Sequence, residues 1–511
     1  MRRAAQLLVI VAFLLFMSGC GSRSSRIPTS NPADVPVSLT VTDTPPSGVT
    51  VLFFQLSITG ATMTPSSGGS VSLLSSANPI PVNVSQLLTD SAFLGSANVP
   101  AGTYNSLSLT FSNPQLTIYN GSDSAIASTC ALNTVCQLTP TTTPLTLAFS
   151  TAPFPVTLTA NSPLAFKLDI HLETVIQSDL TVSLAATNGV TISQLPTPPS
   201  GTPIPHLGHL TGTIQSVNTS TTPNGFTLQT RDGRTLTVDV NSSTSYNYPS
   251  SVCSADNSSC LATQQIVKVE VSLQTDGTLL ASEVDYVQLA GQTTVEGNII
   301  RLSTSGGNTL MDLILQQMSS TSSTLFLGHR VTVTVPVSGV TYAIDSGSFT
   351  LPGGLSFASA SDLIVGQEVS VVVQGSVTTA SGSSSWTPWA GPAATTFTTS
   401  SITLEPSQIT GSVAAVPPTG QLSFTLSTLP VFFVPSMATA STPPTWGPVN
   451  ITVQTTAATT FTNFTTDSIS GLAVNDVVSV GGWVFSTPSG ATTITQAAET
   501  VVDRPGVIPL F

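Results

Sequence analysis

Charged side chains are scarce in this 511-residue sequence. Asp, Glu, Lys and Arg together make up 7% of it, against about 25% in an average soluble domain. Lysine occurs only at Lys167 and Lys268, and the formal net charge is −13. A protein that binds nucleic acid neutralises phosphates with clustered Lys and Arg. The sequence therefore predicts no nucleic-acid partner.

Long apolar runs are missing after the first 20 residues, where no stretch approaches the roughly 20 residues of a membrane-spanning helix. The run at residues 7–16 (LLVIVAFLLF) is short and follows Arg2 and Arg3. This order is typical of a secretory signal peptide. We expect residues 1–20 to be removed on export, which leaves nine basic and 24 acidic side chains and a net charge of −15.

The segment Met17-Ser18-Gly19-Cys20 follows the apolar run. It resembles the lipobox of bacterial lipoproteins, although Met17 stands where Leu is usual. The resemblance implies cleavage before Cys20 and a lipid anchor on its thiol. Gly21 is not the aspartate associated with inner-membrane retention, so the resemblance favours the outer membrane. The alternative is an ordinary signal peptide with an incidental cysteine.

Only four cysteines remain once Cys20 is assigned to the lipid. They form two local pairs, Cys130 with Cys136 and Cys253 with Cys260. Short loops closed by disulfides are expected in an oxidising compartment. A metal site is the alternative, but no further ligand lies nearby at zinc spacing. We predict two small-loop disulfides.

Helical periodicity is nearly absent, apart from a short turn expected at residues 84–88. Many segments alternate apolar and polar residues over five to eight positions, as at 37–41 (VSLTV), 107–111 (LSLTF) and 236–240 (LTVDV). This is the period of half-buried strands. Because 37 Gly and 37 Pro separate these short segments, we predict an all-β protein of the sandwich or barrel class.

Two proline-containing segments divide the mature chain. Residues 21–35 are small and polar, as expected of a flexible tether. Residues 195–208 (LPTPPSGTPIPHLG) hold five prolines in 14 positions and predict a semi-rigid linker. Between them lies an N-terminal domain, residues 36–194, which we expect to be a β-sandwich.

The region after the linker contains repeated sequence. Three segments open with a glycine at the third position, namely 210–214, 295–299 and 409–413. Three later segments share the pattern Leu, five residues, Val, one residue, Val, and begin at Leu261, Leu363 and Leu472. The common order predicts three small β-barrel-like modules in tandem. We name them module 1 (209–289), module 2 (293–407) and module 3 (408–505).

Two resemblances to known families follow from these segments. Residues 38–43 (SLTVTD), Leu94-Gly95 and residues 99–104 (VPAGTY) resemble an uncharacterised domain found at the head of bacterial lipoproteins. That family usually continues its first strand as Thr-Asp-Ala-Pro, whereas this chain has Thr42-Asp43-Thr44-Pro45. The three modules resemble a second uncharacterised family of small β-barrels. Neither resemblance implies a known reaction.

Motifs of common catalytic sites are also missing. The sequence has no Gly-x-Ser-x-Gly elbow, no P-loop and no Asp-x-Asp-x-Asp-Gly calcium loop. Asp43, Asp239 and Asp285 leave Ca²⁺ binding across loops as an alternative, although their spacing does not require it. We expect a non-enzymatic protein without a cofactor or metal.

The four histidines are His171, His206, His209 and His329. His206 and His209 end the proline-rich linker, with no carboxylate or thiolate close to them in sequence. A flexible linker makes a poor preorganised metal site. We therefore expect both to be exposed linker residues.

His171 belongs to residues 166–175 (FKLDIHLETV), the cleanest alternating segment of the chain. Alternation places Lys167, Asp169, His171 and Glu173 on one face, and Phe166, Leu168, Ile170 and Leu172 on the other. We expect a charged solvent face and a core face. The alternative is a metal or acid/base site of Asp169, His171 and Glu173, which would suit a hydrolase of envelope polymers.

Tryptophans provide the best binding hypothesis. Trp386 and Trp389 lie in a Ser/Gly/Pro-rich insertion of module 2, and Trp446 lies in a Pro-rich insertion of module 3. Exposed indole rings would stack on sugars, whereas the alternative is that they cover barrel ends. We expect an envelope protein for structural or ligand-binding display, attached to a membrane by its lipid, with polysaccharide or another envelope protein as the partner.

Overall fold

The computed structural model consists of strands with almost no helix. It describes residues 34–504 except 45–49, 75–77, 88–90, 121–129, 131–133, 161, 178, 196–202, 219–223, 251, 256, 290, 320–321, 380–384, 387–394, 417–420, 428–449 and 487–493. Within this part the one α-helix, α2, spans Leu172–Val175. None of the helices described is long and apolar enough to cross a membrane. The all-β prediction is confirmed.

Two sheets form the N-terminal domain. One has the order β13-β11-β1-β5, and the other is built on β7, β6 and β2, with β3, β4, β9 and β10 beside them. The bounds are β1 Asp34–Thr44, β2 Thr50–Pro65, β3 Val71–Ser72, β4 Ile80–Asn83, β5 Ala92–Pro100, β6 Gly102–Asn120, β7 Thr134–Leu138, β9 Thr146–Phe149, β10 Val156–Leu158, β11 Leu164–His171 and β13 Val190–Gln194. The short strands β8 (Thr142–Thr143) and β12 (Val182–Ser183) form a separate pair.

Alternate residues of the long strands fill the space between these sheets. On β6, Leu107, Leu109 and Phe111 are buried, whereas the hydroxyl-bearing residues between them are half-exposed. On β11, Phe166 and Leu168 are buried in the same way. All five belong to one apolar cluster. Burying each such side chain contributes about 1.5–3 kcal/mol, so the period-two pattern accounts for the sandwich.

Each of the three modules is a five-stranded barrel with one additional short strand. Module 1 contains β14 Ile204–Asn218, β15 Asn224–Thr230, β16 Thr235–Val240, β17 Ser245–Asn247, β18 Gln265–Leu273 and β19 Leu279–Leu289. Module 2 contains β20 Thr294–Ser305, β21 Asn308–Met318, β22 Arg330–Val335, β23 Thr341–Ile344, β24 Glu368–Thr379 and β26 Thr395–Glu405. Module 3 contains β27 Ser407–Ala415, β28 Ser423–Ser427, β29 Ile451–Gln454, β30 Thr460–Thr462, β31 Val477–Ser486 and β32 Ile494–Asp503.

The barrels share one topology. The first three strands form an antiparallel meander, the third runs parallel to the last, and the penultimate strand closes the barrel onto the first. Modules 2 and 3 repeat this pattern, with β22 parallel to β26 and β29 parallel to β32. The additional strands β17, β23 and β30 each lie parallel to the last strand. This order is that of an OB-type barrel.

The repeated sequence patterns correspond to equivalent places in this topology. Leu261, Leu363 and Leu472 each follow a 3₁₀ helix: η2 Ser258–Cys260, η3 Ala360–Asp362 and η5 Ile469–Gly471. The two valines of each pattern then lie in the penultimate strand and are buried. Two of the opening glycines sit where two strands approach closely. A Cβ at Gly212 would lie 2.5 Å from the Gln229 carbonyl oxygen, and a Cβ at Gly297 would lie 2.4 Å from that of Ile314.

The predicted linker is wrong at its C-terminal end. β14 begins at Ile204, which pairs with Leu273, and His209 bridges Ala92 of β5. Gly208 has a φ of +117°, and a Cβ there would lie 2.1 Å from the carbonyl oxygen of Ser91. This close contact explains why the chain enters the barrel already packed on the N-terminal domain. One sheet consequently runs from β13 to β17 through both units.

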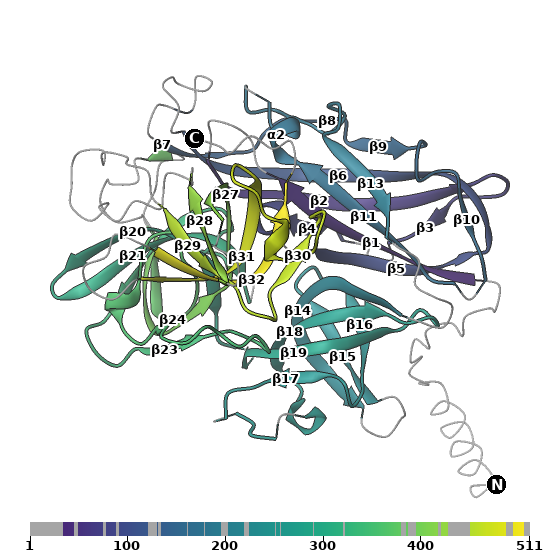
Figure 1. The fold of residues 1–511 in the computed structure, drawn as a ribbon. Coiled ribbons are helices and arrows are strands. Elements are labelled where there is room, and N and C mark those ends of the chain that lie inside the picture. The colour runs from purple at the N-terminus through teal and green to yellow at the C-terminus, as the bar shows by residue number, and fades with distance from the viewer. Residues whose placement is uncertain are drawn as a thin grey trace, which may run out of the picture.

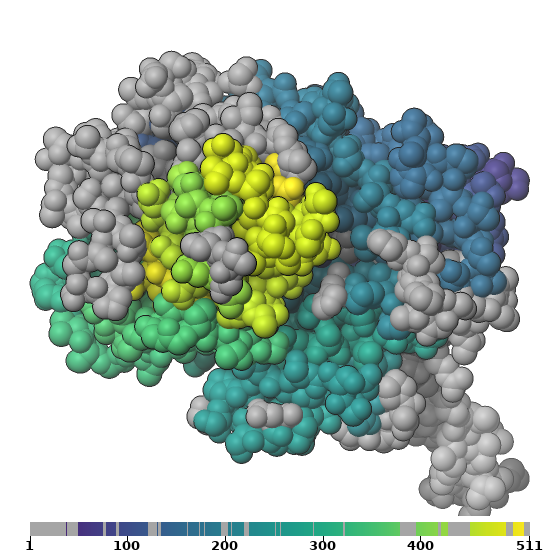
Figure 2. Space-filling view, in the orientation of Figure 1, coloured from purple at the N-terminus to yellow at the C-terminus, as the bar shows by residue number. Residues whose placement is uncertain are grey.

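The three modules are gathered beside the sandwich rather than strung out in a line. Figure 1 shows module 3 (yellow) between module 2 (green) and the N-terminal domain (blue and purple), with module 1 (teal) below them. In the space-filling view of Figure 2 the surfaces of these units meet around module 3.

Candidate functional site

The predicted charged face of residues 166–175 forms only in part. The strand ends at His171, and Glu173 lies in the helical turn α2, so the three candidate residues do not share one strand face. Asp169 Oδ2 lies 3.8 Å from His171 Nε2. Asp169 Oδ1 is buried and has no hydrogen-bond partner. The predicted core face is confirmed, since Phe166 and Leu172 are at most 1% exposed.

A cavity of about 350 Å³ lies in the same domain but does not include this pair. The cavity is lined by the segment 153–164 and by β13 at the edge of the first sheet. The lining residues are Pro153, Pro155, Val156, Thr157, Leu158, Thr159, Ser162, Pro163, Leu164 and Gln194. This cavity therefore gives no support to an acid/base role for Asp169 and His171. Burial lowers the pKa of the neighbouring Lys167, with Asp169 opposing that shift.

The two predicted cysteine pairs are disulfides. The Cα atoms of Cys130 and Cys136 lie 5.7 Å apart, and those of Cys253 and Cys260 lie 5.5 Å apart. The first pair is fully buried beside β7. The proposed lipid attachment site, Cys20, lies outside the described residues.

The tryptophan insertion of module 2 returns to the N-terminal domain. Ser385 and Trp386 form β25, whose backbone pairs with Cys136 and Val135 of β7. This edge pairing fixes the backbone of Trp386, whereas its side chain lies outside the described set. Trp389 and Trp446 lie outside the described residues.

The remaining histidines and isolated acids do not form a metal site in the part of the chain that the structure describes. His209 is a half-buried strand residue rather than an exposed linker residue, because β14 begins before it. His206 also lies in β14, but its side chain is outside the described set. Burial lowers the pKa of His329, whose ring centroid is 5.4 Å from that of Phe326. Burial and the charge of Asp276 raise the pKa of Asp239.

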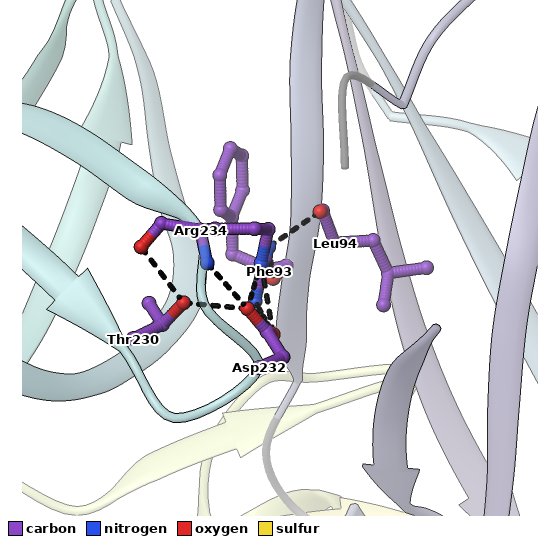
Figure 3. Close-up of polar contacts among 5 residues, drawn as sticks. All are labelled: Phe93, Leu94, Thr230, Asp232 and Arg234. Carbon is purple, nitrogen blue, oxygen red and sulfur yellow. Dashed lines mark hydrogen bonds and ion pairs between the residues drawn. The ribbon is translucent and has the colours of Figure 1, made fainter. Parts of the chain in front are cut away.

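A polar clasp holds module 1 to the N-terminal domain (Figure 3). Arg234, in the turn between β15 and β16, donates from Nη1 to the carbonyl oxygen of Leu94 at 2.6 Å. Its Nε lies 2.9 Å from both carboxylate oxygens of Asp232, which also accepts a 2.6 Å bond from Thr230. Burial alone would raise the pKa of Asp232, but the bonds and charge of Arg234 and the bond of Thr230 hold it below its usual value.

A cluster of six carboxylates lies between modules 1 and 2, and no sequence pattern predicted it. On the module 1 side, Lys268 is opposite Asp285, and Glu270 is opposite Glu283. The residues between them along β18 are buried valines, so these side chains point out of the barrel. His209 on β14 is opposite Glu270.

Module 2 presents its own acidic face. Glu368 of β24 is in register with Asn298 of β20 and with Glu405 of β26. Glu296 is two residues before Asn298 on the same face of β20, and Asp345 follows β23. Glu368 is 1% exposed and Glu405 is 9% exposed. We call Glu283, Asp285, Glu296, Asp345, Glu368 and Glu405 the carboxylate cluster.

Direct contacts join the two faces of the carboxylate cluster. Asn247 Nδ2 donates to Asp345 Oδ1 at 3.2 Å, and Ser348 Oγ donates to Glu283 Oε2 at 3.4 Å. Burial and the charges of Asp345 and Glu283 raise the pKa of Asp285 to about 8, although Lys268 and His209 oppose that shift. The only feature that could have indicated the cluster is the acidic residues at outward positions of these strands, and such residues usually face solvent.

Comparisons with known proteins add two family similarities. Residues 35–192 match a family described as a domain of unknown function (DUF4382). Residues 211–285 and 448–484 match a second domain of unknown function (DUF5666). No curated protein matches the sequence.

Among solved structures, "drosophila Unr CSD456" covers 58% of this chain over 98% of its own length, at 8% identity and a TM-score of 0.14. The N-terminal domain and segments of modules 1 and 3 are thus similar to two uncharacterised domain families.

Proposed function

We propose that this chain is a lipid-anchored protein of the bacterial cell envelope that displays one composite β-rich body in a structural or ligand-binding role, without catalysis. The observation that carries the proposal is the buried seam between the N-terminal domain and module 2. Modules that move independently would not bury side chains against the N-terminal domain. A buried contact of this kind holds the units in one fixed arrangement, as expected of a body that is displayed.

The seam combines apolar and polar contacts. Phe53 and Tyr119 of the sandwich pack with Ile300 and Ile314 of module 2 in one cluster. Around this cluster, Thr117 Oγ1 donates to the Gly328 carbonyl oxygen at 2.8 Å. Because buried polar groups are costly when unpaired, these matched bonds favour one relative placement of the two units.

Module 3 is joined to its neighbours as well. Trp483 and Phe485 pack within the apolar cluster of module 2, and Gln408 donates to the carbonyl oxygen of Gln86 in the N-terminal domain. Module 1 is joined to the N-terminal domain by the hydrogen bond from Arg234 to the carbonyl oxygen of Leu94. The signal-like N-terminus and residues Met17-Ser18-Gly19-Cys20 support a lipid anchor for this body.

Expression in a Gram-negative host with labelled palmitate tests the anchor. We expect the unaltered protein to incorporate label and to fractionate with the outer membrane. Cys20→Ser should incorporate none and appear in the soluble periplasmic fraction, whereas Ser18→Ala, which keeps a small residue in the lipobox, should behave like the unaltered protein. An unlabelled wild-type protein, or a membrane-bound Cys20→Ser variant without label, would overturn the proposal.

Polysaccharide binding is the second candidate. The pairing of β25 with β7 fixes the backbone of Trp386 beside the Cys130–Cys136 disulfide, and a fixed aromatic residue loses little entropy when it binds a sugar ring. A glycan array of the mature protein tests this, with the double variant Trp386→Ala, Trp389→Ala as the control. We expect binding that the double variant loses. No binding, or equal binding by both proteins, would remove this candidate.

A further inference from the structure

The contact between modules 1 and 2 differs from the other contacts between units. Apolar clusters of described residues join the N-terminal domain to module 1, the N-terminal domain to module 2, and module 2 to module 3. None of these described clusters joins module 1 to module 2. Side-chain hydrogen bonds between described residues join these two modules, and two of them end on the carboxylate cluster, at Asp345 and Glu283.

Several oxygens of the carboxylate cluster lack a donor. Glu368 Oε1, Asp285 Oδ1 and Glu283 Oε1 are buried without a hydrogen-bond partner. Glu368 is held at its other oxygen by Asn298 Nδ2 at 3.3 Å. The carboxyl of Glu296 lies within hydrogen-bonding reach of Glu368. Two carboxylates are both acceptors, so this pair forms a bond only when it holds a proton.

The titratable groups around the carboxylate cluster come from every strand that packs there. Module 2 contributes Glu296 on β20, Glu405 on β26 and Asp345 after β23, and module 1 contributes Lys268 and Glu270 on β18, Glu283 and Asp285 on β19, and His209 on β14. Lys268 is the cation shared by Asp285, Glu296, Glu368 and Glu405. One ammonium group cannot balance six ionised carboxylates, and like charges at such short range repel strongly.

We propose that the contact between modules 1 and 2 is a proton-controlled seam. It closes when carboxyls of the cluster hold protons, because an uncharged Asp285 of module 1 is no longer repelled by Asp345 of module 2. It loosens when Asp285, Glu296, Glu368 and Glu405 ionise. The N-terminal domain holds both modules by its own contacts, so loosening changes the angle between modules 1 and 2 without releasing either.

The pKa shifts give the direction of this response. Burial raises the pKa of Glu296, Glu368 and Glu405, and raises that of Asp285 to about 8. A carboxyl whose pKa is raised in the closed state binds protons more tightly there than in the open state. The seam is therefore tightest below the ordinary carboxyl pKa of about 4, and it weakens as pH rises through about 8.

Hydrogen–deuterium exchange of the full-length protein tests the proposal, with rates corrected for the intrinsic effect of pH. We expect protection of β19 and β24 to fall by about tenfold or more between pH 5 and pH 8.5, the change that one shifted pKa unit produces. Protection of β31, in module 3, should not follow the same curve. Equal protection of β19 and β24 at the two pH values would overturn the proposal.

Variants separate protonation from a general effect of pH. Glu368→Gln supplies a permanent donor and should keep most of the protection at pH 8.5. Asp467→Asn, an exposed acid of module 3, should retain the wild-type pH response. Lys268→Met removes the cation that lowers the pKa of these carboxyls and should move the loss of protection to higher pH. A wild-type response in both Glu368→Gln and Lys268→Met would show that the cluster does not control the seam.

Discussion

Gln316 of module 2 donates from Nε2 to the backbone carbonyl oxygen of Leu52 in the N-terminal domain at 2.6 Å. Leu52 lies at a bulge, where the register between β2 and β6 shifts between Val51 and Phe53. A bulged residue is left out of the regular ladder of backbone bonds. The carbonyl of Leu52 therefore obtains its partner from another unit of the chain.

Replacing Gln316 by Ala should loosen the contact between module 2 and the N-terminal domain. The change removes the donor to Leu52 and to Asn298 Oδ1, which accepts from the same nitrogen at 2.7 Å. An unpaired buried acceptor costs about 1–3 kcal/mol. We expect faster hydrogen exchange in β2 and β21. Gln317→Ala, at the exposed neighbouring position, should change stability by less than about 0.5 kcal/mol. Equal effects of the two variants would contradict this reading.

Asp232 should make the clasp on Leu94 sensitive to acid. Its pKa is held below the usual value by Arg234 and Thr230, against the opposing effect of burial. A lowered pKa adds stability that is complete above the unfolded value of about 3.9 and is lost as pH falls through the folded value. Asp232→Asn should therefore weaken protection of β5 against hydrogen exchange at pH 6, and the difference from wild type should shrink toward pH 3.

Asp276→Asn is the matched control for Asp232→Asn. Asp276 precedes a glycine in the turn between β18 and β19 and accepts bonds from the backbone and side chain of Thr278, at 3.0 and 2.8 Å. It thus repeats the turn chemistry of Asp232 within module 1 alone. Its substitution should leave β5 unchanged at both pH values. A loss of protection in β5 with this variant would show that turn geometry, not the clasp, controls that strand.

Gly297 should not tolerate a side chain. A Cβ there would lie 2.4 Å from the Ile314 carbonyl oxygen, so Gly297→Ala must push β20 away from β21 or shift the backbone. Overpacking of this kind costs about 1–3 kcal/mol. We expect a lower melting temperature for Gly297→Ala. Gly353→Ala, where nothing lies within 4 Å of the new atom, should melt close to wild type, and a similar drop in both would remove the steric explanation.

Local sequence patterns predicted the strands, the cysteine pairs and the repeats, because alternation and loop length act over a few residues. The alternating face of Phe166 and Leu168 is buried as the pattern requires. The same pattern failed for Glu173, since α2 turns the chain after His171. Alternation states which residues share a face for as long as the strand continues, and does not state where the strand ends.

Local sequence patterns could not predict how the N-terminal domain and the modules pack against one another. By the alternation of their strands, Glu368 and Ile314 point away from the interior of their own barrel. They are buried because another unit covers them: Ile314 packs against Phe53, and Glu368 faces Lys268. Contacts between residues hundreds of positions apart depend on how whole barrels fit together. The predicted C-terminal end of the linker was wrong for the same reason. β14 already begins within the predicted linker and lies beside β5 of the N-terminal domain.

Trp483 should couple module 3 to module 2 through both its ring and its N–H group. It is 1% exposed, donates from Nε1 to the Asp345 carbonyl oxygen at 2.7 Å, and stacks on Phe349 with ring centroids 5.3 Å apart. Trp483→Phe keeps an aromatic ring but leaves that carbonyl without its donor, at a cost of about 1–3 kcal/mol. Trp483→Ala also opens a cavity, and large-to-small changes of this kind cost about 3–5 kcal/mol.

The two Trp483 variants should therefore form an ordered series. Hydrogen exchange in β31 and in β23, which precedes Asp345, should accelerate modestly in Trp483→Phe and strongly in Trp483→Ala. Val474→Ala is a control in module 3, since Val474 is 49% exposed and its truncation removes little buried area. If Trp483→Ala left β23 protected while β31 opened, module 3 would be losing its own core. The packing of Trp483 in module 2 would then not be what holds the two modules together.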